Sequence, residues 1–337
     1  MDGRKEKIMN TKLTINKEIY EENFKIAKKA FVLNSGMEAS ACAASFIGDT
    51  QPTSAEDMKA AKKILNKSTS VVSILGRGNA RQVVTATLAR SGNPEDAMEK
   101  IIKIHKAFDK KFFNSDYLVL AAVIIYRSCK PSEYDVAIQR TREIYKLIRK
   151  DHPLITGRED IVNCAMMAIS GIDVNKLASD CEDSFKALNK LFFGKNKIQY
   201  MSCVLSLFDE DAVVKAEKTR LTRDLLKSEG VRFDSDAYAI IGAVAMIVDD
   251  KDKKRIAKEI KNTSDEIKSI RGMGPVGAGK RIRNLIATAL VLDAYAGSAS
   301  GVASLAINAI ITAIIIAEAA AVAAATTAAA SSAAASS

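Results

Sequence analysis

Residues 113–126 read FNSDYLVLAAVIIY, and residues 233–248 read FDSDAYAIIGAVAMIV. The two stretches begin 120 residues apart, and each passes from a turn signal into an apolar run. Such runs are too short to cross a bilayer, and a helix that is apolar all round must be buried on several sides. The two stretches therefore predict equivalent buried helices in a repeated unit.

The same alternation recurs along the chain. Each unit begins with an amphipathic, charged stretch, and a shorter apolar stretch follows it. Residues that favour the start of a helix, such as Ser54 or Asn93-Pro94, open the charged stretches. The turns into the apolar stretches are expected near seven residues: Gly36, Asn79, Ser115, Gly157, Asn196, Ser235 and Gly277. This spacing predicts an all-α chain of stacked αα-hairpins of about forty residues, an α-solenoid. A non-repetitive helical bundle is the alternative.

In repeat length and helix pairing, the units resemble the HEAT-like α-solenoid class. The regular proline, aspartate and basic positions of that class are missing, so the resemblance is one of architecture. The chain as a whole, with its alanine-rich end, is also similar to a family of bacterial proteins known only as a domain of unknown function. That resemblance implies no activity.

Three regions are predicted. Residues 1–296 form the helical repeat domain with about seven hairpins, residues 297–325 form a hydrophobic, alanine-rich C-terminal helix, and residues 326–337 form a low-complexity tail. The stretch from Ala294 to Ala317 carries no charge. As a soluble helix, the segment covers an exposed end of the stack or dimerises there. As a membrane tail anchor, it inserts and leaves basic residues on the cytoplasmic side.

The composition offers few residues for a histidine-rich metal site or for a Ser/His/Asp catalytic triad. The chain has two histidines, His105 and His152, which we expect at the surface, and its five cysteines include no Cys-x-x-Cys pair. We therefore expect no cofactor and no metal, and we lean against an enzyme. The charged start lacks the apolar core of a secretory signal, so we expect a cytoplasmic protein, with membrane association as the alternative.

A glycine-rich segment, from Gly272 to Arg281, contains G-x-x-x-x-G-K and resembles a phosphate-binding loop. The Ser or Thr expected after the lysine is Arg281, and the preceding segment is charged and helical, so nucleotide hydrolysis is disfavoured. The amides of the next helix and its basic side chains remain candidates for contacting an anion or an acidic partner. The candidates are Gly277, Gly279, Lys280, Arg281 and Arg283.

The net charge is +10, but the 50 basic residues are interleaved with 40 acidic ones. This composition favours a non-catalytic helical-repeat scaffold that binds another protein. A basic repeat protein that grips nucleic-acid phosphates along a concave face is the first alternative. A scaffold anchored to a membrane through its C-terminal helix is the second. Homo-oligomerisation stays open.

Overall fold

Capping side chains start the outer helices where the sequence predicts helix starts. Ser54 Oγ accepts a hydrogen bond from the backbone N–H of Asp57 at 2.9 Å. Asn93 Oδ1 accepts one from the backbone N–H of Asp96 at 3.1 Å. Each bond satisfies an amide that has no partner inside its own helix. Local sequence therefore fixes where these helices begin.

The computed structural model describes residues 3–31, 36–69, 74–77, 80–109, 112, 114–297, 301, 304–305 and 307–308. These residues form helices and no strand, which confirms the all-α class. Seven outer helices are α1 (Gly3–Ala30), α3 (Ala55–Ser68), α6 (Pro94–Asp109), α8 (Tyr134–Asp151), α10 (Val174–Leu188), α12 (Ala212–Ser228) and α14 (Lys253–Glu266). Seven inner helices are α2 (Gly36–Ala44), α5 (Arg81–Ala89), α7 (Asp116–Ser128), α9 (Asp160–Ile169), α11 (Lys195–Leu205), α13 (Tyr238–Ile247) and α15 (Gly279–Ala296). Short helices are α4 (Ile74–Arg77), η1 (Pro131–Glu133), η2 (Ser235–Ala237) and η3 (Ile267–Ser269).

The predicted turns mark the starts of the inner helices. Six of the seven predicted positions lie at or within a few residues of an inner-helix start or of the 3-10 turn before it: Gly36, Ser115, Gly157, Asn196, Ser235 and Gly277. The seventh, Asn79, lies outside the described residues. The pairing of an amphipathic helix with a more apolar one is thus confirmed for the described hairpins.

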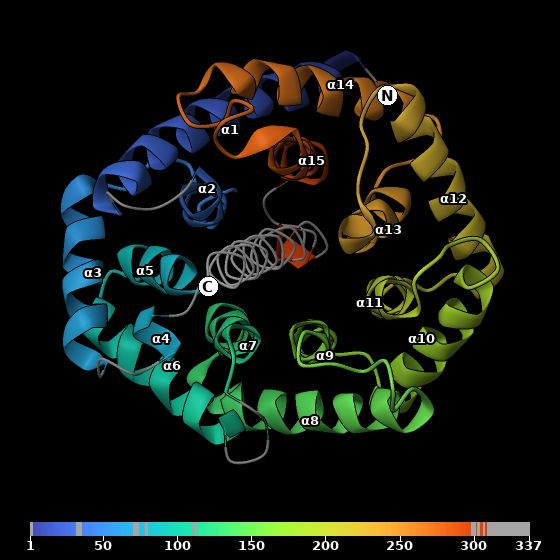
Figure 1. Ribbon diagram of the computed structural model, residues 1–337, viewed down its shortest axis with the longest axis horizontal. Coiled ribbons are helices and arrows are strands. Elements are labelled where there is room, and N and C mark those ends of the chain that lie inside the picture. The colour runs from blue at the N-terminus through green and yellow to red at the C-terminus, as the bar shows by residue number, and fades with distance from the viewer. Residues whose placement is uncertain are drawn as a thin grey trace, which may run out of the picture.

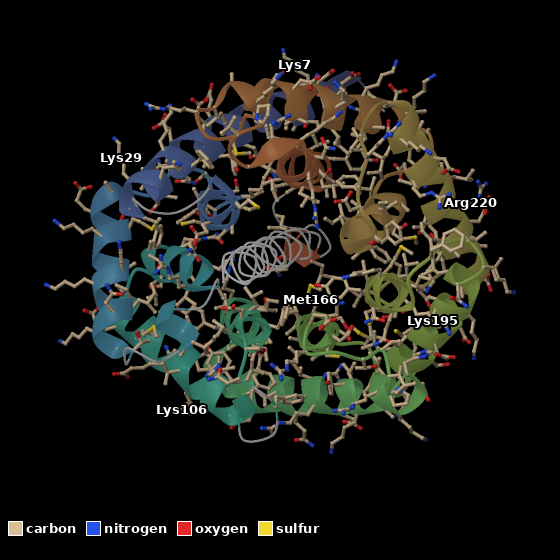
Figure 2. The ribbon with its side chains drawn as sticks, viewed as in Figure 1. Lys7, Lys29, Lys106, Met166, Lys195 and Arg220 are labelled. Atoms are coloured by element: carbon tan, nitrogen blue, oxygen red, sulfur yellow. The ribbon has the colours of Figure 1, made fainter. Side chains whose placement is uncertain are left out.

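Figure 1 shows the two layers as concentric rings, with the outer helices around the circumference and the inner helices seen end-on. Burial follows the layers. In α7 every residue from 118 to 125 is buried, whereas α8 buries one face only. Figure 2 shows Lys106 and Arg220 at the outer circumference, while Met166 of α9 points toward the middle. An apolar inner helix is stable here because it packs against its own partner and both neighbouring hairpins.

The hairpins close on themselves instead of forming an open stack. The last inner helix, α15, packs against both α1 and α2. Asp293 Oδ2 accepts a hydrogen bond from Asn16 at 2.9 Å and pairs with Lys12 at 3.0 Å. Lys17 and Glu266 add an ion pair between α1 and α14. The predicted stack of hairpins therefore closes into a ring, in which α15 packs against α1 and α2 of the first hairpin.

All inner helices run in the same direction along the ring axis. At their carboxyl ends, the carbonyl oxygen of Ser45 accepts hydrogen bonds from Arg90 at 2.6 Å and from Arg127 at 3.3 Å. Near their amino ends, Gln199 Nε2 donates to Thr156 Oγ1 at 2.9 Å. The turns that precede the inner helices consequently gather at one end of the ring. We call this the amino end; its described turns include residues 152–159, 189–194, 229–234 and 270–278.

Most of the predicted C-terminal helix and all of the predicted tail lie outside the described residues. The described positions between 301 and 308 lie near the middle of the ring (Figure 1), where Ile307 joins the core. In the described part of the chain, no helix combines the length and apolarity that crossing a bilayer requires.

Candidate functional site

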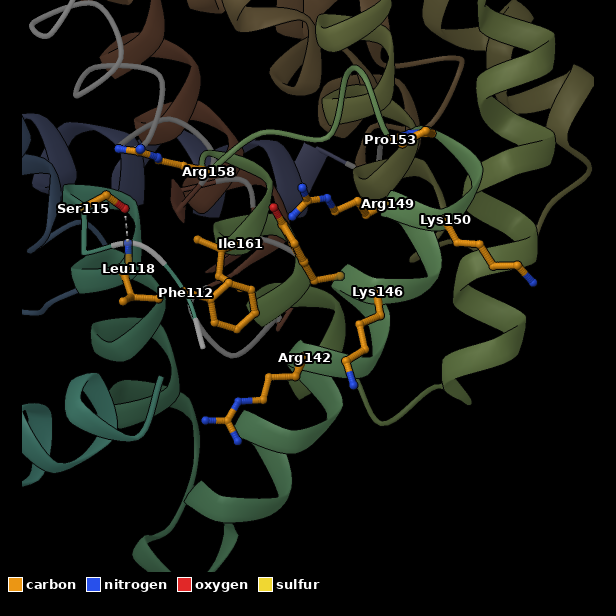
Figure 3. A pocket seen from close by; sticks show the side chains of 11 residues that line it. Phe112, Ser115, Leu118, Arg142, Lys146, Arg149, Lys150, Pro153, Arg158 and Ile161 are labelled. Carbon is orange, nitrogen blue, oxygen red and sulfur yellow. Dashed lines mark hydrogen bonds between the residues drawn. The ribbon is translucent and has the colours of Figure 1, made fainter. Parts of the chain in front are cut away.

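A cavity of about 460 Å³ opens beside α8, between the third and fourth hairpins. Its walls come from the α6–α7 turn, the first turns of α7 and α9, the second half of α8 and the turn that follows it. The lining residues are Phe112, Ser115, Leu118, Arg142, Tyr145, Lys146, Arg149, Lys150, Pro153, Arg158 and Ile161 (Figure 3). We call this the α8 pocket.

The basic side chains of the α8 pocket follow from helical spacing. Arg142, Lys146 and Arg149 are separated by four and three residues, so they share one stripe of α8. Ile144 and Ile148 are buried on the neighbouring face and anchor the helix to the core. Figure 3 shows the three cations along the helix, with Lys150 extending away from them. Because α8 is amphipathic, these three cations lie beside the face that packs against the core.

The floor of the pocket is apolar and aromatic. The rings of Phe112 and Tyr145 meet edge to face, with centroids 5.1 Å apart and planes at 86°. Leu118 and Ile161 are buried beside them, in the first turns of two inner helices. A cavity of this size with an apolar floor and a few polar groups is typical of sites for small molecules.

Positive charge dominates the pocket, since its described lining holds five cations and no Asp, Glu, His or Cys. One Arg142 Nη donates to the carbonyl oxygen of Ala107, whereas its Nε is buried without a hydrogen-bond partner among the described residues. Lys146, Arg149 and Lys150 form no ion pair with any acidic residue in the described part of the chain. Burial raises the pKa of Tyr145, and the nearby Arg149 opposes that shift.

A buried carboxyl group organises the turn at the back of the pocket. Asp160 Oδ2 accepts a hydrogen bond from Gly157 N at 2.7 Å, and the hydroxyl of Tyr145 donates to the carbonyl oxygen of Gly157 at 3.4 Å. Asp160 is 2% exposed, and this burial raises its pKa to about 8 despite the hydrogen bond from Gly157. The turn that carries Arg158 is therefore tied to a group that titrates near neutral pH.

Stability should depend on this carboxyl group. Because its pKa is raised from 3.8 in the unfolded chain to about 8 in the fold, its contribution is fully present below about pH 4 and is lost as pH rises through 8. Asp160→Asn keeps an acceptor for Gly157 N and cannot ionise. We expect its stability relative to the wild type to increase with pH, by up to about 1.4 kcal/mol per pH unit between pH 5 and 8. Urea unfolding at pH 5, 7 and 9 measures this, and a constant difference would contradict it.

The structure places the predicted glycine-rich residues in the turn before α15, at the amino end. Gly277 N and Gly279 N both donate to the carbonyl oxygen of Gly274, at 3.0 and 3.1 Å. These two amides are thus used within the turn. Arg283 points into the core, where it is 5% exposed and donates to the carbonyl oxygen of Met273 at 2.6 Å.

The two remaining basic candidates lie at the surface. Arg281 pairs with Asp234 of the preceding hairpin at 3.2 Å, and Lys280 is exposed. The structure therefore brings Gly277, Gly279, Lys280 and Arg281 together and separates Arg283 from them. An anion or partner contact at Lys280 and Arg281 stays a prediction.

Close packing accounts for the glycines in this turn. A Cβ on Gly277 would lie 1.9 Å from the carbonyl oxygen of Gly272, and one on Gly36 would lie 2.4 Å from the same atom. Backbone atoms cannot move aside as flexible side-chain ends can. The glycine motif therefore joins the first inner helix to the last at the ring closure, which is a structural role.

The histidines differ from their expected surface positions. His105 is buried, and His152 is partly buried, with its Nε2 2.5 Å from Glu182 Oε2. Within the described residues, no group of three or more His, Cys, Asp or Glu side chains is arranged to hold a metal ion. Four of the five cysteines are buried, Cys129 is half-buried, and all five are free thiols.

Comparison with known proteins places the chain in a family. The sequence profile described as "Protein of unknown function (DUF4003)" matches residues 23–320. The chain belongs to the DUF4003 family. No curated protein and no solved structure matches it. In this DUF4003 protein, the α8 pocket and the glycine-rich turn both lie inside the matched range.

Sequence reasoning missed the α8 pocket of this DUF4003 protein, although part of its signal was present. Arg142, Lys146 and Arg149 form a basic stripe on the helix that also carries Tyr145. Ile161 comes from α9 of the same hairpin, whereas Phe112 comes from the preceding hairpin, and only the packing of the two hairpins brings Phe112 to α8. A basic stripe alone is typical of any solvated helix face.

Proposed function

We propose that this protein is a non-catalytic binding protein whose α8 pocket holds an amphipathic anion. The observation that carries the proposal is the lining of the pocket, which combines an apolar floor with five cations and no acidic side chain among the described residues. The ligand class that fits is a phosphate or carboxylate joined to an acyl or aromatic body. The anionic group would meet the α8 cations, and the apolar body would rest against Phe112 and Ile161.

Several features support binding over catalysis. The pocket lacks a described carboxylate, imidazole or thiol that could serve as a general base or nucleophile. The hydroxyl group of Ser115 caps α7 by accepting from Leu118 N, and that of Tyr145 donates to Gly157. These groups are engaged in positioning the walls of the pocket.

The broader expectations from sequence stay predictions. A protein partner with an acidic, apolar surface group would present the same chemistry to the α8 pocket as a small amphiphile. Binding of nucleic-acid phosphates along a concave face draws less support from a closed ring, because the described inner helices surround its middle and leave no long open groove between separate ends (Figure 1). We therefore favour a ligand of pocket size over a long polymer.

Three probes test the proposal: dodecyl phosphate, dodecanol and inorganic phosphate. Isothermal titration of the full chain should show that dodecyl phosphate binds at least about tenfold more tightly than either of the others, because only this probe pairs charge with apolar contact. Equal binding of dodecanol would show that the cations add nothing to the affinity, and no binding of dodecyl phosphate would contradict the proposal.

A further inference from the structure

The amino end of the ring carries three apolar side chains that protrude into solvent. Leu154, in the α8–α9 turn, is 97% exposed, and Phe193, in the α10–α11 turn, is 89% exposed. Val276, in the turn before α15, is fully exposed. Each projects from the same kind of turn in a different hairpin, and all three turns lie at the same end because the inner helices are parallel. We call these residues the apolar tips.

Exposed cations flank every apolar tip. Lys190 and Lys195 lie within three residues of Phe193, and both are exposed. The segment from 186 to 197 holds four lysines and no acidic residue. Lys190 and Lys195 form no ion pair with an acidic residue in the described part of the chain.

The other two tips repeat the arrangement. The exposed Lys150 precedes Leu154 by four residues and the exposed Arg158 follows it by four, while one exposed carboxylate, Asp151, lies beside Lys150. Val276 lies between Arg271 and Lys280, which are both exposed. Three turns that are far apart in the sequence thus share one composition, an apolar tip beside one or more cations.

The opposite end of the ring is rich in negative charge. The turns that precede the outer helices are rich in carboxylates, as in Asp209-Glu210-Asp211 and Asp249-Asp250. Carboxylates favour the amino ends of helices and cations favour the carboxyl ends, so the uniform direction of the outer helices sorts charge between the two ends of the ring. The described turns that precede the outer helices therefore hold more acidic than basic residues, whereas exposed cations such as Lys150, Lys190 and Lys280 lie near the amino end.

We infer that the amino end of the ring docks on an anionic phospholipid bilayer. Isolated apolar tips set among cations match the interfacial region of a membrane, where apolar groups enter the headgroup layer and cations meet lipid phosphates. A protein partner would be expected to require a contiguous apolar centre, whereas here the tips are separated by turns of the ring. This inference concerns the surface of the ring and does not depend on a ligand in the α8 pocket or on the C-terminal segment.

Vesicle co-sedimentation of the full chain tests the inference. The probes are vesicles of phosphatidylcholine alone and of a two-to-one mixture of phosphatidylcholine and phosphatidylserine. We expect the wild type to pellet with the mixed vesicles and to remain largely in the supernatant with phosphatidylcholine. Leu154→Ser/Phe193→Ser/Val276→Ser should lower the partition coefficient on mixed vesicles by about tenfold or more, since binding scales with the apolar area inserted.

A matched control replaces exposed apolar residues away from the amino end. Val136→Ser/Val213→Ser/Leu221→Ser removes side chains that are also exposed, and it should bind like the wild type. Lys190→Glu/Lys195→Glu should weaken binding to mixed vesicles by about tenfold. All variants keep the C-terminal segment, so retained pelleting of the tip variant would assign membrane binding elsewhere and overturn the inference. Failure of the wild type to pellet with mixed vesicles would overturn it as well.

Discussion

Replacing Lys146 and Arg149 together by glutamate is expected to weaken dodecyl phosphate binding by about a hundredfold or more. Each substitution removes an attraction to the bound anion and adds a repulsion. A hundredfold loss corresponds to about 2.7 kcal/mol, which is modest beside the roughly 4 kcal/mol between unit charges 4 Å apart near a protein surface. Both side chains are exposed on α8, and the new glutamates can pair with neighbouring cations, so the fold should persist.

A control with the same change in charge separates local from general electrostatics. Lys59→Glu/Lys63→Glu reverses two exposed lysines of α3, away from the α8 pocket. We expect this variant to bind dodecyl phosphate within about threefold of the wild type, because exposed charges beyond roughly 10 Å are screened at ordinary salt. Equal losses in both variants would mean that net charge, and not the α8 pocket, governs binding.

Replacing Asp293 by alanine is expected to cause a large loss of stability, about 2–4 kcal/mol. Asp293 is 2% exposed and joins α15 to α1 through Asn16 and Lys12. Removing its carboxylate leaves the buried Asn16 amide without its carboxylate acceptor and Lys12 without its counter-ion. The free energy of unfolding in urea measures the loss.

Glu266→Ala provides the comparison at the same junction. Glu266 pairs with Lys17 across the ring closure, but its side chain is largely exposed, so we expect a loss below about 1 kcal/mol. A loss in Asp293→Ala no greater than that in Glu266→Ala would contradict the buried contact between the first and last hairpins.

Sequence was sufficient for the hairpins because their signals are local. Ser54 and Asn93 cap outer helices at the expected positions, and the apolar run after Ser115 becomes a buried inner helix. Closure of the ring could not be predicted in the same way, since it depends on the angle between successive hairpins. That angle accumulates over the whole ring before Asp293 meets Asn16.

The candidate sites likewise differ in how much of each can be predicted from local sequence. The spacing of the glycine-rich turn resembles a phosphate-binding loop, yet Gly277 is required by a close backbone approach to Gly272. The α8 pocket gave a weaker signal, because part of its lining, namely Phe112, Ser115 and Leu118, comes from the preceding hairpin. Spacing along one helix can indicate a charged stripe such as Arg142 and Arg149, but it cannot show which aromatic residue lies opposite.

The contact between the first and last hairpins is what closes the ring. A variant with Lys17→Cys and Glu266→Cys, made in a Cys129→Ser background, tests it through reaction with a short bis-maleimide. The closed ring predicts rapid crosslinking within the monomer, so that digestion yields one joined peptide containing positions 17 and 266. Monomers that carry separate, unjoined linkers at the two positions would contradict the closed ring, because the first and seventh hairpins lie at opposite ends of an open stack.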